Sequence, residues 1–393
     1  MSKHTVLVIN SGSSSIKYQL VDPDTGEAVA KGIVEQIGEP NAHARHEYGD
    51  NKWDLNEPIE DHTVGMGVVE KAFEDYGPDL QAVHVVAVGH RVVQGGKYFN
   101  GPELIDERVH GLIEELIPLG PLHNPAHLKG IDAAKKMFPE LPQVAVFDTA
   151  FFQDLPEASA TYALNREIAD KYSIRRYGAH GTSHQFVSSA VSKFLGRDNL
   201  KQIVLHLGNG ASASAVVNGH AVDTSMGLTP LEGLVMGTRT GDIDPAAVFH
   251  LQRQGGMSVD EIDNLFNKQS GLKGMCGSND MREVVEMAEK GDPAARLTLD
   301  VQRHRLIKYI GAYTAVMGGL DALTFTAGIG ENSPVLRERV CERLEYMGVK
   351  IDSDLNWNGK GARVISTPDS SVQVVVYPTN EELAIAQQAL TLV

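Results

Sequence analysis

The sequence has few cysteines, a deficit of positive charge and no long apolar run. Its two cysteines, Cys276 and Cys341, form neither a zinc-ligand nor a redox spacing, so we expect reduced thiols. The formal net charge of −16 argues against binding to nucleic acid or to an anionic membrane surface. The apolar run VLVI is too short for a signal peptide, and no run approaches the ~20 apolar residues of a membrane span. These absences predict a soluble, cytoplasmic protein.

Length and composition predict two globular domains. The 393 residues exceed the size at which a single core usually stops growing. Hydrophobic residues make up 42% and charged residues 22% of the chain, which is typical of folded proteins. The 39 glycines are about a tenth of the residues, against about 7% usually, and indicate tight turns or close backbone approach. Any anionic substrate must be held by local cations, because the overall charge opposes it.

Apolar strand patterns alternate with helical patterns, which predicts an α/β fold. The strand patterns occupy residues 5–10, 16–22, 83–89, 143–148, 202–208, 213–218, 322–328 and 372–378. Helix starts are indicated by a capping residue before proline at Asn124, Asp244 and Ser333, and by capping boxes at 258–261 and 379–382. The longest helical pattern runs from Pro293 to about Met317.

The two halves of the chain share a plan. TVLVINSGSSSIKYQLVD and QIVLHLGNGASASAVVNGHAVD each contain an apolar strand, a turn rich in Gly, Ser and Asn, and a second strand. Duplicated domains would explain this, and so would the chance similarity of two hairpins. A final helix over about 380–392 is one element too many for the second half, so we expect it to pack on the first. A hinge is expected near Thr149.

The first of these turns lacks the features of a P-loop. The Walker pattern needs a second Gly beside the Lys, then Ser or Thr, then a helix, whereas Ile16 precedes Lys17 and Tyr18 follows it. Alternating apolar residues predict a half-buried strand instead, with Lys17 beside the turn that contains Ser13 and Ser15. Backbone N–H groups in such a turn can bind phosphate. An ordinary hairpin with a surface lysine fits the same residues.

Two further glycine-rich turns follow apolar strands. HLGNGAS contains Gly208 and Gly210, and AGIGENSP leads into the helix start at Ser333. Glycines let backbone approach an anion closely, and a helix N-terminus offers unpaired N–H donors. Three such turns together predict a polyphosphate ligand.

Two arginines lie in loops at the ends of strands or before helices, where functional residues are common. Arg91 occurs in GHRVVQGG and Arg239 in VMGTRTGDIDP. Each could be a solvated surface charge, but flanking glycines and the lack of an acidic i,i+4 partner favour a functional role.

Histidines occur twice with H-x-x-x-H spacing, in PLHNPAH and AHGTSH. On a helix this spacing can bind zinc, but Pro125 and Gly181 interrupt the helix within each pair. We therefore interpret His123 and His180 as loop donors to a charged oxygen.

Acidic residues end one strand and begin the last helix. Asp148 follows QVAVF, where a turn or a helix cap is the alternative to a functional role. Glu382 is expected to complete a capping box with Thr379, which leaves Glu381 available to hold a hydrated magnesium ion.

Taken together, these segments resemble the acetate kinase (acetokinase) family, a branch of the acetate and sugar kinase, Hsp70 and actin superfamily. The similar stretches are VLVINSGSSSIKYQL, GHRVVQGG, PLHNPAH, VAVFDTAFF, RRYGAHGTSH, HLGNGASASA, DTSMGLTPLEGLVMGTRTGDIDP, FTAGIGEN and PTNEELAIA, which extend from residue 6 to residue 386. The resemblance implies two duplicated RNase H-like domains, residues 1–149 plus 382–393 and residues 150–381, with an active-site cleft between them. It also implies a homodimer, with the nucleotide site and the dimer interface in the second domain.

The resemblance implies reversible, in-line transfer of the ATP γ-phosphoryl group to acetate, which gives acetyl phosphate and ADP. It implies that Asn10 and Glu381 bind Mg²⁺, or Mn²⁺ in its place, that Arg91 holds acetate, and that His180 and Arg239 stabilise the transition state with His123 in support. The remaining residues would bind ATP: Lys17, Ser13, Ser15, His206, Leu207, Gly208, Asn209, Gly210, Asp280, Met281, Arg282, Gly328, Ile329, Gly330, Glu331 and Asn332.

The family assigns Asp148 as a proton donor or acceptor. Acetate is already ionised at neutral pH, because carboxyl pKa values lie near ~4. We therefore expect Asp148 to orient Arg91 or a magnesium-bound water.

Two positions depart from the family pattern, and two other functions remain open. Gln94 and Phe152 stand where histidine is common. A propionate or butyrate kinase is one alternative, because one methylene is worth only ~1–3 kcal/mol in a pocket. An actin- or Hsp70-like ATPase is the other, although it would not need Arg91, His180 and Arg239.

Overall fold

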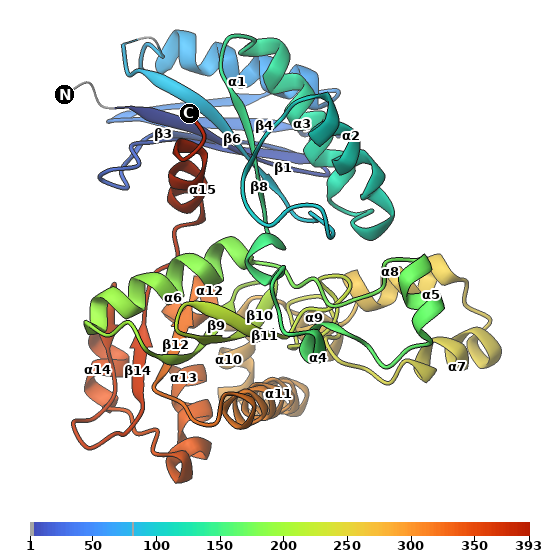
Figure 1. Ribbon diagram of the computed structural model, residues 1–393, viewed down its shortest axis with the longest axis vertical. Helices are drawn as coiled ribbons and strands as arrows, with labels where there is room; N and C mark the ends of the chain where they lie inside the picture. The colour runs from blue at the N-terminus through green and yellow to red at the C-terminus, as the bar shows by residue number, and fades with distance from the viewer. Residues whose placement is uncertain (1–3, 81) are drawn as a thin grey trace. The chain divides into compact units, whose positions relative to one another are not determined.

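The computed structural model describes residues 4–80 and 82–393. The chain divides into two compact units, Met1–Gln153 with Asn380–Val393, and Asp154–Thr379 (Figure 1). The sequence placed the divisions at 149/150 and 381/382. Each unit is built on its own sheet.

The first unit contains an eight-stranded mixed sheet with the order β5-β4-β3-β2-β1-β6-β8-β7. Strands β1 to β5 form an antiparallel meander, β6 and β8 run parallel to β1, and β7 is antiparallel at the edge. The strands are β1 (Thr5–Gly12), β2 (Ser15–Val21), β3 (Ala28–Glu35), β4 (His43–Tyr48), β5 (Asn51–Asn56), β6 (Val85–Val92), β7 (Glu103–Leu104) and β8 (Gln143–Phe147). The α-helices are α1 (His62–Tyr76), α2 (Glu107–Glu115), α3 (Asn124–Met137) and α15 (Glu381–Leu390), with short 3₁₀ turns at Ile117–Leu119 and Ala150–Phe152.

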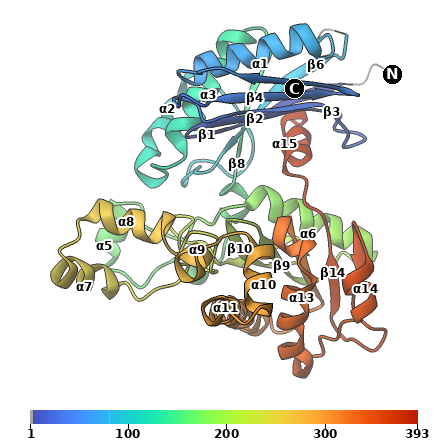
Figure 2. The same ribbon diagram turned by 180° about the vertical axis from the view of Figure 1, so that it is seen from behind.

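Helices cover both faces of this sheet because successive side chains of β1 point to opposite sides. Leu7 and Ile9 belong to a core that includes residues of α1 and α3, whereas Val6 and Val8 pack in a core with Ile385 of α15. Figures 1 and 2 show α1 and α3 on one face and α15 on the other. The final helix therefore completes the first unit.

The second unit contains a six-stranded mixed sheet with the order β11-β10-β9-β12-β14-β13. Its strands are β9 (Lys201–Leu207), β10 (Ala211–Val217), β11 (His220–Thr224), β12 (Ala322–Thr326), β13 (Arg363–Val364) and β14 (Gln373–Val376). Its helices are α4 (Glu157–Ala160), α5 (Arg166–Lys171), α6 (Gly181–Leu195), α7 (Ala246–Gly255), α8 (Val259–Lys268), α9 (Gly271–Cys276), α10 (Met281–Glu289), α11 (Pro293–Met317), α12 (Ala327–Asn332), α13 (Pro334–Cys341) and α14 (Ser353–Asn358), with a 3₁₀ segment at Glu342–Met347.

The two sheets share one strand arrangement. In the first, β3-β2-β1 form an antiparallel meander followed by parallel β6 and β8; in the second, β11-β10-β9 form the meander, followed by parallel β12 and β14. The fold is therefore α/β with two mixed sheets, as predicted. The similarity of the two sequence hairpins reflects this shared arrangement.

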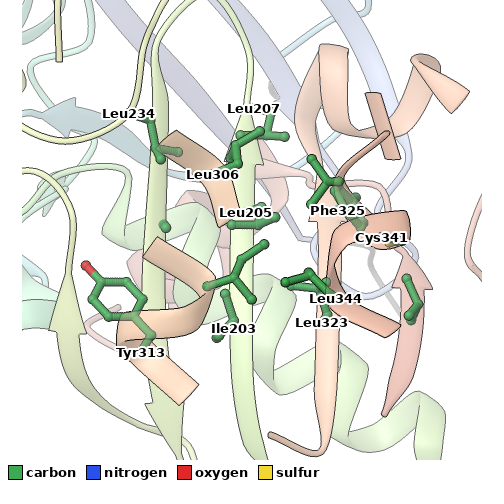
Figure 3. Close-up of a cluster of buried hydrophobic side chains, with 14 of the residues drawn as sticks. Ile203, Leu205, Leu207, Leu234, Leu306, Tyr313, Leu323, Phe325, Cys341 and Leu344 are labelled. Atoms are coloured by element: carbon green, nitrogen blue, oxygen red, sulfur yellow. The ribbon is translucent and has the colours of Figure 1, made fainter. Parts of the chain in front are cut away.

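The core of the second unit lies between its sheet and helices α11 and α13. Ile203, Leu205 and Phe325 from the strands meet Leu306 and Tyr313 of α11, as Figure 3 shows. On the other face, Val187 and Val191 of α6 pack on Val204 and Val375. Strand β9 is buried on both faces, because every residue from Gln202 to Leu207 is buried.

Local signals predicted some elements better than others. Helix α11 spans Pro293–Met317 as expected, and the Ser258–Glu261 capping box is present. The strands β3, β4 and β5 were not predicted, because their polar and glycine-interrupted sequences lack a clear apolar alternation. The turn at residue 327 is itself helical as α12, and a second helix starts at Pro334.

No helix within residues 4–80 and 82–393 is long and apolar enough to cross a bilayer.

Candidate active site

The parallel strands of the first unit bring three of the expected residues to one edge of the sheet. Asn10 lies near the end of β1, Arg91 is the penultimate residue of β6, and Asp148 directly follows β8. Because β1, β6 and β8 are parallel neighbours, their carboxyl ends meet at this edge. Open α/β sheets commonly bind ligands there.

Arg91 and Asp148 form a bidentate ion pair. Arg91 donates from Nε to Oδ1 of Asp148 at 3.1 Å and from an Nη to Oδ2 at 2.7 Å. The Asp148 side chain is almost fully buried, whereas about a fifth of the Arg91 side chain is exposed. The acidic partner of Arg91 directly follows the neighbouring strand β8. The i,i+4 spacing considers only residues that are close in sequence, so it does not identify this partner. The geometry fixes the direction of the guanidinium.

The charge of Arg91 is secured by nearby carboxylates. Burial disfavours the guanidinium cation, but the charges of Asp148 and Glu381 outweigh that effect and raise the pKa of Arg91. A planar cation held this way can bind a second carboxylate with its remaining donors.

Lys17 lies on β2 directly opposite Asn10, so it extends from a strand and not from a P-loop helix. Its Nζ is 2.5 Å from Oε1 of Glu382. The turn between β1 and β2 is anchored by the contact of His62 Nε2 with the Gly12 carbonyl at 2.7 Å. Ser13 is exposed in that turn and Ser15 is half-buried.

The last helix begins differently from the expectation. Asn380 caps α15 by accepting from the Leu383 N–H at 3.0 Å, so the expected capping box of Thr379 and Glu382 was wrong. Asn380 occupies the cap position because the helix starts one residue later, and this releases Glu382 to pair with Lys17. Glu381 is the first residue of the helix and acts electrostatically on Arg91.

The oxygen donors of Asn10 and Glu381 suit a magnesium ion. Mg²⁺ prefers oxygen ligands and usually combines one or two carboxylates with water and substrate phosphates. Residues 4–80 and 82–393 contain no cluster of three or more His, Cys, Asp or Glu suited to a metal. This donor set fits an ion shared with a phosphate better than an ion enclosed by protein ligands.

His123 and the two departures from the family pattern lie in well-packed segments. His123 precedes α3 at its N-cap position, and its ring lies 6.5 Å from that of His127. Gln94 is buried, and its side-chain oxygen accepts from the Gly96 N–H at 2.8 Å. Phe152 is fully buried against Phe151. The Gln94 amide thus makes a hydrogen bond that holds the loop after β6.

In the second unit, His180 is fixed in an unusual backbone conformation. It precedes α6 with φ 58° and ψ 21°, in the left-handed region, which costs energy for a non-glycine residue. Its Nδ1 lies 2.8 Å from the Ser212 hydroxyl, and its ring stacks on His206 with centroids 4.3 Å apart. These contacts place the Nε2 edge of the ring beside Gly210.

Arg239 and His180 converge on the glycine-rich turn after β9. A Cβ placed on Gly210 would lie 3.4 Å from the His180 ring and 3.8 Å from Nη1 of Arg239. Arg239 also donates to the Pro230 carbonyl at 3.1 Å. Two cationic or donor side chains therefore border a turn whose glycines leave space for an anion.

The Arg239 loop is built on the same turn. The Gly237 N–H donates to the Asn209 carbonyl at 2.8 Å, and a Cβ on Gly237 would lie 1.9 Å from Asn209 Oδ1. Gly271, at φ +62°, passes the Met236 carbonyl so closely that a Cβ would be 2.1 Å from it. A side chain at Gly271 would displace the backbone of Met236 and Arg239, and a side chain at Gly237 would displace the Asn209 side chain.

A second ion pair supports this loop and was not predicted. Arg176 donates to Glu232 at 2.8 Å and to the carbonyls of Thr224 and Met226, and Tyr162 donates to the same carboxylate. The stretch RRYGAHGTSH contained Arg176, but its sequence gave no sign of a partner 56 residues away.

A cavity of about 830 Å³ contains much of the expected nucleotide site. Its lining includes Asn209, Asp280, Met281, Arg282, Gly328, Ile329 and Asn332, as expected, and also Val285, Pro334 and Trp357, which were not. Of the other described candidates, His206, Leu207, Gly208, Gly210, Gly330 and Glu331 lie outside this lining. His206 instead contacts the Ser183 hydroxyl, and Glu331 accepts from the Thr379 N–H. The cavity therefore extends beyond the Gly-rich turns.

A family model described as the acetokinase family matches residues 5–387. The chain belongs to the acetokinase family. It is 55% identical to the acetate kinase of Streptomyces coelicolor, over 100% of this chain and 98% of that protein, and 54% identical to the acetate kinase of Leifsonia xyli, over 98% of each.

Solved structures of acetokinase relatives have the same fold. The acetate kinase of Porphyromonas gingivalis matches with a TM-score of 0.94 at 43% identity, covering 99% of both chains. A propionate kinase from Francisella tularensis matches with a TM-score of 0.93 at 44% identity, covering 98% of both chains. The similarity therefore extends over both units.

Proposed function

We propose that this acetokinase catalyses reversible phosphoryl transfer between ATP and acetate. Its identity of 54–55% to curated acetate kinases over essentially the whole chain carries this proposal. An acetate oxygen attacks the γ-phosphorus as the bond from that phosphorus to the ADP oxygen breaks, giving acetyl phosphate and ADP. Such transfer depends on positioning and charge neutralisation, so each unit is expected to supply cations and donors.

We assign acetate binding to Arg91. Asp148 holds its guanidinium through two hydrogen bonds, which leaves the remaining donors to bind the acetate carboxylate. Asp148 acts by orienting Arg91, because acetate needs no base to become a nucleophile at neutral pH.

We assign the transferring phosphoryl group to Arg239 and His180, which border the Gly210 turn. Arg239 supplies positive charge, and His180 supplies a hydrogen-bond donor whose direction is fixed by Ser212. Donors that are already oriented lower the barrier because they need no reorganisation during the reaction. Lys17, Ser13 and Ser15 are proposed to contact the phosphates from the first unit.

The metal proposal names Asn10 and Glu381, directly or through water. A bound Mg²⁺, or Mn²⁺ in its place, would neutralise phosphate charge and orient the phosphate chain. The charge of Glu381 also raises the pKa of Arg91, so Glu381 acts on both parts of the site.

The kinase proposal is tested by incubating the protein with Mg-ATP, acetate and hydroxylamine. Acetyl phosphate reacts with hydroxylamine, so we expect acetyl hydroxamate to accumulate in proportion to enzyme. ATP hydrolysis that is unchanged by acetate, with no hydroxamate, would refute the proposal and favour an ATPase.

Propionate is a second candidate acceptor because a solved propionate kinase matches the chain as well as a solved acetate kinase does. The same assay with acetate, propionate and butyrate distinguishes the candidates by kcat/KM. We expect acetate to give the highest value; a higher value for propionate would reassign the substrate.

We also propose that the acetokinase is a homodimer. Light scattering during size-exclusion chromatography checks this, and a mass of one 42.5 kDa chain would refute it.

A further inference from the structure

Helix α14 places a tryptophan in the wall of the nucleotide cavity. Trp357 lines the cavity that also contains Asp280, Met281 and Ile329. Its side chain is 48% exposed, although large aromatic residues usually bury most of their surface. A half-exposed indole in a cavity wall presents a flat apolar face to a ligand.

Asn356, the residue before Trp357, is held in place by hydrogen bonds to Pro334 and Arg337. Asn356 donates from Nδ2 to the carbonyl of Pro334, another lining residue, at 3.0 Å. Arg337, which is 1% exposed, donates to both the side-chain and main-chain oxygens of Asn356 at 2.7 Å and 2.8 Å. Trp357 is thus attached to an anchored helix.

The same arginine connects this helix to the glycine-rich turn. Arg337 donates to the carbonyls of Gly330 and Glu331 in α12 at 2.8 Å and 2.9 Å. From the other side, Arg363 donates to the Leu355 carbonyl at 3.2 Å. The backbone of α14 beside Trp357 is therefore held to α12, which contains the lining residues Gly328 and Ile329.

The lining of the cavity combines polar and apolar surface. Asn209 lies in the turn assigned to phosphate and contacts Asn279 at 3.0 Å. Trp357, Pro334 and Val335 contribute apolar surface instead. A nucleotide presents both kinds of surface, with an anionic phosphate chain and a flat base.

We propose that Trp357 contacts the base of the bound nucleotide and contributes to nucleotide affinity; this inference rests on the proposed kinase function. Stacking of a base on an aromatic side chain changes affinity by about tenfold, within a wide range. The contact is made equally before and during phosphoryl transfer, so its loss is expected to change KM for ATP more than kcat.

Fluorescence tests this contact directly, because the sequence contains only two tryptophans. Trp53 lies on β5 in the first unit, where it stacks on Tyr76 with centroids 5.5 Å apart. In a Trp53→Phe variant, all tryptophan emission comes from Trp357. We expect a saturable emission change with Mg-ADP and none with tripolyphosphate, which has no base. ADP binding detected by calorimetry without an emission change would overturn the inference.

A second measurement compares affinities. Trp357→Ala is expected to raise the Kd for ADP about tenfold, whereas Trp357→Phe should retain most of the affinity because it keeps an aromatic face. An unchanged Kd in Trp357→Ala would also overturn the inference. If acetate-dependent turnover is present but emission does not respond, the inference alone fails; if emission responds without such turnover, the proposed function alone fails.

Discussion

Lys17 on β2 and Glu382 on α15 are 365 residues apart in sequence, yet Nζ and Oε1 lie 2.5 Å apart. The pair brings the last helix of the chain to the turn that is expected to bind phosphate. Half of the Lys17 side chain and a fifth of the Glu382 side chain are exposed. A phosphate that binds Lys17 must therefore compete with a carboxylate for the same ammonium group.

This competition predicts different effects for the two partners. Glu382→Gln is expected to leave KM for ATP unchanged or lower and to change the free energy of unfolding by about 1 kcal/mol or less. Lys17→Met removes the phosphate contact and should raise KM for ATP ~10- to 100-fold. Steady-state kinetics and urea unfolding check both variants. Equal increases in KM would show that the ion pair itself matters, and not a contact of Lys17 with phosphate.

The Arg91–Asp148 pair predicts strong coupling between the two residues. Asp148→Asn leaves a largely buried guanidinium without its counter-charge, and breaking a buried pair costs ~3–5 kcal/mol. Arg91→Met should also be destabilising, but the double variant should lose much less than the sum of the two changes. Urea unfolding of the four proteins gives the coupling free energy. Additive losses would contradict the role of Asp148 as the residue that holds Arg91.

Arg239 is expected to act mainly in the transition state. Arg239→Ala should lower kcat by about 10²- to 10³-fold while the melting temperature stays close to that of the parent. Arg253→Ala is the matched control, because Arg253 is exposed on α7 and lies 6.0 Å from the ring of Phe249. Near-normal turnover of Arg239→Ala in the hydroxamate assay would refute the assignment.

Stability should fall in mild acid because of His90. Burial lowers the pKa of His90 to about 4 from its ordinary 6.5, although its bond to Gln143 partly opposes this. Between these two values the unfolded chain binds a proton that the folded chain does not, so unfolding becomes easier as pH falls. One such group costs about 2 kcal/mol between pH 6.5 and 5.

A comparison with His90→Gln isolates this contribution. The variant lacks the titrating group, so its free energy of unfolding should fall less than that of the parent between pH 7 and pH 5. Urea unfolding at the two pH values provides the measurement. Equal losses in both proteins would assign the acid sensitivity to other groups.

The sequence predicts those strands whose apolar residues continue or alternate clearly, such as β1, β9 and β12. It does not predict β3 to β5, whose sequences form strands by successive pairing, β3 with β2, β4 with β3 and β5 with β4. Pairing of strands supplies backbone hydrogen bonds and one buried face, and neither is visible in a single short segment. The Asn380 cap was missed for a related reason, since both Thr379 and Asn380 are good capping residues.

Individual site residues were easier to predict than their partners. Asp148 was expected to orient Arg91 or a magnesium-bound water, and the parallel pairing of β6 with β8 is what places the two side chains together. Trp357 gave no sequence signal, because its place in the cavity wall depends on the bonds of the neighbouring Asn356 to Arg337 and Pro334. Local chemistry marks a side chain as able to act, whereas tertiary contacts decide on what it acts.

Helix α15 has a consequence for how this chain is made. Val6, Val8, Ala87 and Val144 of the first sheet are covered by Ile385 and its neighbours near the C-terminus. A ribosome makes those covering residues after the whole of the second unit, so the apolar strands of the first unit remain open to water, or to a chaperone, until then. Truncation near residue 380 would leave that face permanently bare and prone to aggregation. The first unit can therefore complete its fold only after the second unit has been translated.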